Sequence, residues 1–126
     1  MVSTKNYHKG LLYLIHLLIS ADGVIDEREF ASLALIKSKE KIPDSLFKEF
    51  EETLRLKTER EIFKTGIRLI GECSIKQKLK AFVHLYNMAK VDGSVHEREV
   101  RLLLYSVKAA GIEFADVVKQ AHAQSK

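Results

Sequence analysis

The chain has 126 residues, of which 46% are hydrophobic and 30% charged, and its formal net charge is +4. This composition is that of an ordinary globular protein and argues against a disordered chain, and the length suits a single domain over residues 1–126 with a sizeable core. The lone cysteine, Cys73, excludes an internal disulfide and favours a reducing compartment, so we expect a cytoplasmic protein.

Helical periodicity and capping residues predict an all-α fold of about seven helices. The first and fifth helices are apolar around most of their circumference, which is typical of helices buried on every side. The other five each have one apolar face, and we expect them to surround the central pair. In chain order, the expected ranges are about 4–21, 27–39, 45–56, 59–73, 75–91, 97–110 and 114–124.

Several helix ends are marked by capping residues. Thr58 stands three residues before Glu61, and Ser74 stands three residues before Gln77, which is the spacing of a capping box. Gly111 follows the sixth helix, where a residue in the left-handed conformation commonly closes a helix.

A short acidic motif occurs twice, and the two copies are 70 residues apart. The first copy, DGVIDEREF, begins at Asp22, and the second, DGSVHEREV, begins at Asp92. Each copy follows an apolar helix and precedes an amphipathic one. The sequence therefore predicts two half-repeats, at about 4–56 and 75–124, joined by the helix at about 59–73 and related by a pseudo-twofold axis.

Helix capping explains most of this motif. Asp26 and Glu29 have the spacing of a capping box at the start of the second helix, and Gly23 suits a left-handed helix end. Capping leaves the acids at Asp22 and Asp92 unexplained, because the carboxyl end of a helix favours cations. An Asx-turn or a bound cation would account for each of them.

The same turns offer two sets of candidate metal ligands. The first copy has an all-oxygen set suited to Ca²⁺ or Mg²⁺, and the second, with a histidine, is nearer to a site for Mn²⁺ or Zn²⁺. The spacing is not that of an EF-hand, which needs twelve residues with ligands at alternate positions. The candidate ligands are Asp22, Asp26 and Glu29 in the first copy, and Asp92, His96 and Glu99 in the second.

The chain resembles the TerB-like superfamily, which is named after tellurite-resistance TerB. The resemblance is carried by an apolar helix, followed by the pattern Asp-Gly-x-Ile/Val-x-x-x-Glu and an amphipathic helix, and this order occurs twice. The resemblance covers nearly the whole chain. It implies an all-helical fold with two buried central helices, and an association with metal or envelope stress without a well-defined reaction. The signature positions that it implies are Asp22, Gly23, Ile25 and Glu29, and likewise Asp92, Gly93, Val95 and Glu99. His96 stands where the first copy has Asp26, so the two copies differ as cation sites.

Other chemistry is sparse in the sequence. It contains no phosphate-binding glycine loop, zinc-type Cys/His spacing or nucleophile elbow, so we expect no enzyme. His16 and His84 on the central helices are expected to be hydrogen-bonded core or groove histidines. Tyr13, Tyr86 and Tyr105 are expected at the edge of the core, with hydroxyls that reach water.

We therefore expect a non-enzymatic, stress-associated module that binds a protein partner and has two candidate divalent-cation sites. The alternative is an adaptor whose acidic turns are only helix caps. A minor alternative is nucleic-acid binding through the second half, whose charge is +5 against −1 for the first. No stacking aromatics or reading motif accompany its lysines. The apolar run at 11–21 is too short to span a bilayer, so no transmembrane segment is expected.

Overall fold

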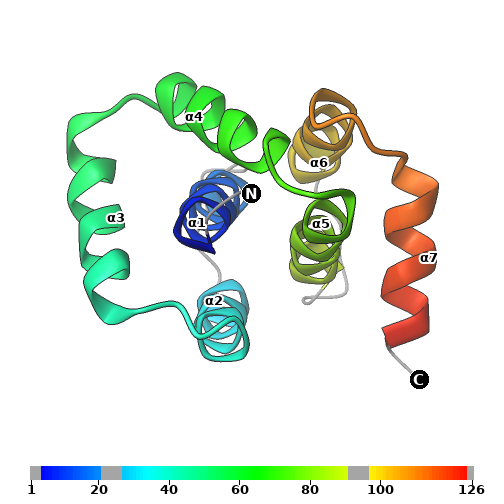
Figure 1. Cartoon of the computed structure of the whole chain (residues 1–126), viewed down its shortest axis with the longest axis horizontal. Coiled ribbons are helices and arrows are strands. Elements are labelled where there is room, and N and C mark those ends of the chain that lie inside the picture. The colour runs from blue at the N-terminus through cyan, green and yellow to red at the C-terminus, as the bar shows by residue number, and fades with distance from the viewer. Residues whose placement is uncertain (1–3, 21–26, 91–96, 125–126) are drawn as a thin grey trace.

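The fold is that of a computed structural model, which describes residues 4–20, 27–90 and 97–124. Within these ranges all regular secondary structure is helical and no strand occurs, which confirms the predicted all-α class. None of the described helices is both long and apolar enough to cross a membrane. The helices are α1 (Thr4–Ser20), α2 (Glu27–Lys39), α3 (Asp44–Leu56), α4 (Glu59–Gly71), α5 (Ile75–Lys90), α6 (Glu97–Ala109) and α7 (Phe114–Gln124) (Figure 1).

The helix bounds agree closely with the predicted ranges, with two informative differences. α4 ends at Gly71, two residues early, because the N–H of Cys73 bonds to the carbonyl of Ile70 at 3.0 Å and tightens the turn. α3 begins one residue early, at Asp44, because Pro43 serves as its N-cap residue. The predicted last residues of the first and fifth helices, 21 and 91, lie outside the described residues.

The caps predicted at Thr58, Ser74 and Gly111 are present, while Gly23 and Asp26 lie outside the described residues. The N–H of Glu61 donates to Oγ1 of Thr58 at 3.2 Å. At the start of α5, the N–H of Gln77 donates to Oγ of Ser74, and the N–H of Ser74 donates back to Oε1 of Gln77, both at 3.2 Å. Gly111 has φ 79°, the left-handed conformation expected after α6. Local sequence therefore determines these helix limits.

α1 and α5 are the central helices, as predicted from their apolar circumference. α3 and α4 pack on α1, while α6 and α7 pack on α5, and α1 and α5 also contact each other. Figure 1 views α1, α2, α5 and α6 nearly end-on, with α3, α4 and α7 lying across them. The central helices contribute many of the most buried apolar side chains, among them Leu11, Leu12, Tyr13, Leu14 and Ile15 of α1 and Ala81, Phe82, Val83 and Leu85 of α5.

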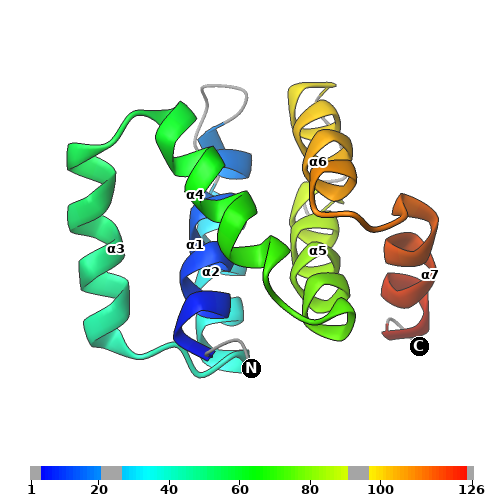
Figure 2. The same ribbon diagram turned by 45° about the horizontal axis from the view of Figure 1, so that its top comes forward.

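The closest helix packing joins α1 to α4, which run past each other in Figure 2. Two glycines face this contact. A Cβ atom at Gly10 would lie 2.9 Å from Cγ1 of Ile70, and a Cβ atom at Gly66 would lie 3.1 Å from Cβ of Tyr13. The absence of side chains at these two positions therefore permits the close approach of the two helices.

The ends of α2 and α6 have the same backbone structure, 70 residues apart. Lys41 and Gly111 both adopt positive φ, at 55° and 79°. The N–H groups of Ile42 and Ile112 each donate to the carbonyl five residues earlier, at 3.0 and 3.2 Å, which is the Schellman arrangement. These two helix ends therefore have the same 70-residue spacing as the acidic motifs have in the sequence. A pseudo-twofold axis between the halves stays a prediction.

Candidate functional site

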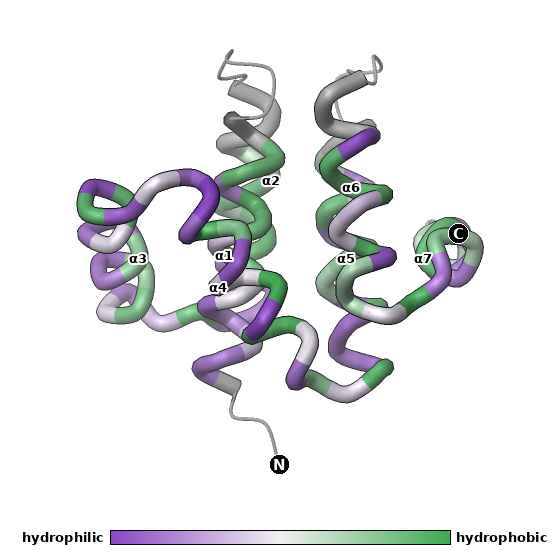
Figure 3. The backbone as a smooth tube through the Cα atoms, turned by 90° about the horizontal axis from the view of Figure 1, so that it is seen from above, coloured by the Kyte–Doolittle hydropathy of each residue, from purple (hydrophilic) through white to green (hydrophobic). Residues whose placement is uncertain are grey.

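Each acidic motif begins in the connection between two helices and continues into the first turn of the second helix, which is α2 for the first copy and α6 for the second. α1 and α5 run in the same direction, so both motifs follow helices that end at the same side of the molecule (Figure 3). Among the described residues, no group of three or more His, Cys, Asp or Glu could hold a metal ion. Of the predicted ligands, Asp22, Asp26, Asp92 and His96 lie outside the described residues, as do the side chains of Glu29 and Glu99 in the first turns of α2 and α6. Metal binding there stays a prediction.

A buried carboxylate forms the centre of the densest polar contacts in the described part of the chain. Glu40 directly follows α2, and its side chain is only 5% exposed. The Tyr7 hydroxyl donates to Oε2 of Glu40 at 2.8 Å, and Nε2 of His84 lies 2.9 Å from the same oxygen. Nζ of Lys80 lies 3.1 Å from Oε1. We call these four residues the Glu40 cluster.

The helices position this cluster in a simple way. Lys80 and His84 are four residues apart on α5 and therefore project from one face of it, while Tyr7 comes from α1. The dipole of α2 disfavours a carboxylate at its C-terminal end, so Glu40 needs partners from outside its own helix. In the second half, Ala110 occupies the position 70 residues after Glu40 and is buried. The second half therefore has no carboxylate at the position equivalent to Glu40, and the cluster joins α2 to both central helices.

The electrostatics of the cluster favour an ionised Glu40. Burial raises the pKa of this carboxyl, but hydrogen bonds from His84, Tyr7 and Lys80, together with the positive charge of Lys80, lower it to about 2. Burial, followed by the hydrogen bond to Glu40, raises the pKa of the Tyr7 hydroxyl far above its usual value. Neither group titrates near neutral pH. The arrangement therefore holds an ionised carboxylate that connects α2 to α1 and α5.

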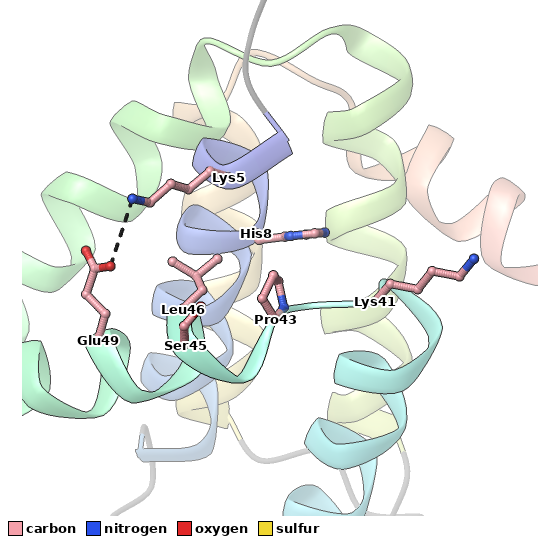
Figure 4. A pocket seen from close by; sticks show the side chains of 7 residues that line it. All are labelled: Lys5, His8, Lys41, Pro43, Ser45, Leu46 and Glu49. Atoms are coloured by element: carbon pink, nitrogen blue, oxygen red, sulfur yellow. Dashed lines mark ion pairs between the residues drawn. The ribbon is translucent and has the colours of Figure 1, made fainter.

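A pocket of about 410 Å³ is lined in part by His8 and Lys41, which directly follow Tyr7 and Glu40 of the cluster in the sequence (Figure 4). His8, which is only 5% exposed, lies at its inner side, and burial lowers the pKa of the ring. At the rim, Nζ of Lys5 lies 4.0 Å from Oε2 of Glu49. The pocket thus combines a neutral imidazole with an ion pair at its rim. Its lining residues are Lys5, His8, Lys41, Pro43, Ser45, Leu46 and Glu49.

One of the predicted core-edge tyrosines is placed differently from expectation. Tyr13 is fully buried, and its hydroxyl is the one buried side-chain polar atom without a hydrogen-bond partner in the described part of the chain. The prediction that this hydroxyl reaches water is wrong, because Gly66 lets α4 close over Tyr13 and the ring of Phe50 lies 5.8 Å away. Tyr105 is 63% exposed, and Tyr86 is half-buried.

The two histidines of the central helices have different surroundings. His84 is hydrogen-bonded to Glu40, as predicted for a core or groove histidine. His16 is half-buried, its ring lies 6.3 Å from that of Phe50, and burial lowers its pKa. Cys73 is buried, and its Sγ lies 3.4 Å from the carbonyl of Leu69, in keeping with a small core residue.

Sequence analysis did not find the Glu40 cluster. Two signals for it were nevertheless present. Glu40 is an acid at the C-terminal end of a helix, the same anomaly that drew attention to Asp22 and Asp92. Lys80 and His84 are ionisable residues four apart on a central helix, where a charged or polar side chain needs a partner.

No protein-family model, curated protein or solved structure matches this chain. The resemblance to TerB-like domains therefore depends on the repeated motif and on the order of the helices alone.

Proposed function

We propose that this protein is a non-enzymatic TerB-like module, associated with metal or envelope stress, that binds a protein partner and holds divalent cations at its two acidic turns. The observation that carries the cation part is the repeated acid, Asp22 and Asp92, each placed directly after a central helix. Such a position is unfavourable for a carboxylate unless a cation or a local turn compensates it. The parallel course of α1 and α5 adds support, because the described ends of these two helices, which precede the motifs in the chain, lie at one side of the molecule (Figure 3).

A second candidate, an adaptor whose acidic turns are only caps, is favoured by a specific observation. Glu40 also lies at the C-terminal end of a helix, and its charge is compensated entirely by Tyr7, Lys80 and His84. This chain therefore uses its own side chains to stabilise an acid at such a position. If Asp22 and Asp92 are compensated in the same way, they need no cation.

Thermal unfolding in the presence of millimolar Ca²⁺, Mg²⁺, Mn²⁺ or Zn²⁺ distinguishes the two candidates. An ion that binds only the folded protein raises the melting temperature as its concentration rises above its Kd. We expect this rise for the unaltered protein and its loss in Asp22→Asn combined with Asp92→Asn. Glu113→Gln combined with Asp116→Asn, which removes the same charge from exposed positions, is the control and should keep the response.

The cation proposal fails if no ion raises the melting temperature, or if the Asp22/Asp92 double variant responds as the unaltered protein does. Either result would favour the adaptor.

A further inference from the structure

A groove lies between the N-terminal turns of α5 and the later part of α7. These two helices lie side by side in Figures 1 and 2 and pack closely. The groove has a volume of about 580 Å³, and we call it the α5–α7 groove. Its lining residues are Ile75, Lys76, Leu79, Lys80 and Gln120.

The apolar part of the groove is open to solvent. Ile75, the first residue of α5, is 69% exposed, and Leu79, one turn later, is half-buried. The two residues are four apart, so they form a short apolar strip along one face of the helix. An isoleucine so exposed at the rim of a groove makes this a candidate contact surface.

The charged residues that line the groove beside this strip are both lysines. Lys76 and Lys80 are also four residues apart, so they form a second strip beside the apolar one. Lys76 is exposed, and the side chain of Lys80 is 55% exposed although its Nζ also contacts the buried Glu40. The groove's lining residues include no carboxylate, and Lys119 next to Gln120 is a further exposed cation.

We propose that the α5–α7 groove docks an acidic amphipathic segment of a partner protein. Apolar side chains of that segment would lie against Ile75 and Leu79, and its carboxylates would pair with Lys76. Lys80, whose Nζ is already paired with Glu40, would contribute less. The charge complementarity selects an acidic partner, and the apolar strip selects one with large apolar residues at regular spacing. The inference deepens the protein-binding part of the proposed function and depends on it, but it does not depend on cation binding.

The shape and composition of the groove favour a protein segment over other anionic partners. The lining residues include no aromatic ring on which a nucleic-acid base could stack. Ile75 protrudes at the rim, but Leu79 is half-buried inside the groove, where a flat membrane surface would not reach it. A peptide helix can place both its apolar and its acidic side chains into such a hollow.

The test is selection from a displayed library of random peptides of about 16 residues on the full chain, a length that allows about four helical turns. The enriched peptides should combine acidic residues with large apolar residues three or four apart. Their binding, measured by fluorescence anisotropy, should weaken at least about tenfold in Ile75→Ser combined with Lys76→Glu, because both the apolar contact and the charge attraction are lost. Both positions are exposed, and an acid in the first turn of α5 suits the helix dipole, so this variant should fold.

Leu56→Ser combined with Lys57→Glu is the matched control. Leu56 is 86% exposed and Lys57 is exposed, so the same chemical change is made away from the groove, at the end of α3. This control should bind the selected peptides as the unaltered protein does. The Asp22/Asp92 double variant should also keep peptide binding, and the Ile75/Lys76 variant should keep any cation response. The test can therefore contradict either proposal without contradicting the other.

The inference is overturned if no peptide is enriched, or if the enriched peptides bind the groove variant and the control equally. It is also overturned if phosphatidylserine vesicles or single-stranded DNA bind through Ile75 and Lys76 while the selected peptides do not compete. The latter result would assign the groove to a membrane or a nucleic acid instead.

Discussion

Nε2 of His84 lies 2.9 Å from Oε2 of Glu40, although the two residues are 44 positions apart in the chain. The contact joins the middle of α5 to the end of α2, and Tyr7 adds α1 to the same carboxylate. A single buried side chain thus connects the first half of the chain to the central helix of the second.

Replacing Glu40 by alanine should destabilise the protein strongly. The change would leave Tyr7, Lys80 and His84 without the group that they share. We expect the free energy of unfolding to fall by about 3 kcal/mol. This is the lower end of the range expected when a buried ion pair is broken, because Lys80 is 55% exposed. Urea unfolding at neutral pH measures it. Glu72→Ala, which removes an exposed acid, should change stability by less than about 0.5 kcal/mol, and equal effects of the two changes would contradict the role of the cluster.

The contribution of Glu40 should also depend on pH. Its pKa is about 2 in the folded protein, against an ordinary value of 4.5, so between these values the unfolded chain binds more protons than the folded one. Stability therefore rises with pH across this window, and the contribution is present above about pH 4.5 and lost as the pH falls toward 2. The measurement is the difference in unfolding free energy between the unaltered protein and Glu40→Gln across that range. A difference that stays constant with pH would show that the carboxylate charge is not what the partners stabilise.

Gly10→Ala should destabilise the contact between α1 and α4. The new methyl group would lie 2.9 Å from Cγ1 of Ile70, so either the Ile70 side chain or one of the two helices must shift. The expected cost is about 1–3 kcal/mol, reduced by the better helix propensity of alanine. Gly71→Ala is the matched control, because no atom lies within 4 Å of a Cβ there, and it should be nearly neutral. If both variants unfold at the same denaturant concentration, the close packing has no energetic role.

Truncation of either central helix should be costly. Leu14 of α1 and Leu85 of α5 are each only 2% exposed, and Leu14→Ala or Leu85→Ala should each reduce stability by about 2–5 kcal/mol through lost burial and a cavity. Leu56→Ala, at a position that is 86% exposed, should have little effect on the denaturation midpoint. A small loss at Leu85 alone would mean that α5 is not a true core helix.

The sequence by itself determined the helices and their order. The lack of a polar face identified α1 and α5 as central, and the capping pairs at Thr58 and Ser74 located the helix starts. Both signals involve residues only a few positions apart. The acidic turns of the candidate site were found in the same way, through a repeat visible in the chain. Whether Asp22 and Asp92 hold a cation depends on the folded positions of their ligands, which no pattern of spacing supplies.

Only the tertiary structure decided how the helices meet. The burial of Tyr13 follows from the approach of α4 at Gly66, and the α5–α7 groove follows from where α7 crosses α5. The Glu40 cluster joins residues 33 and 44 positions apart, for Tyr7 and His84 respectively. Helical periodicity shows which face of a helix is apolar, but not which other helix covers that face. A buried carboxylate and its partners can therefore be recognised as a unit only after the helices have packed.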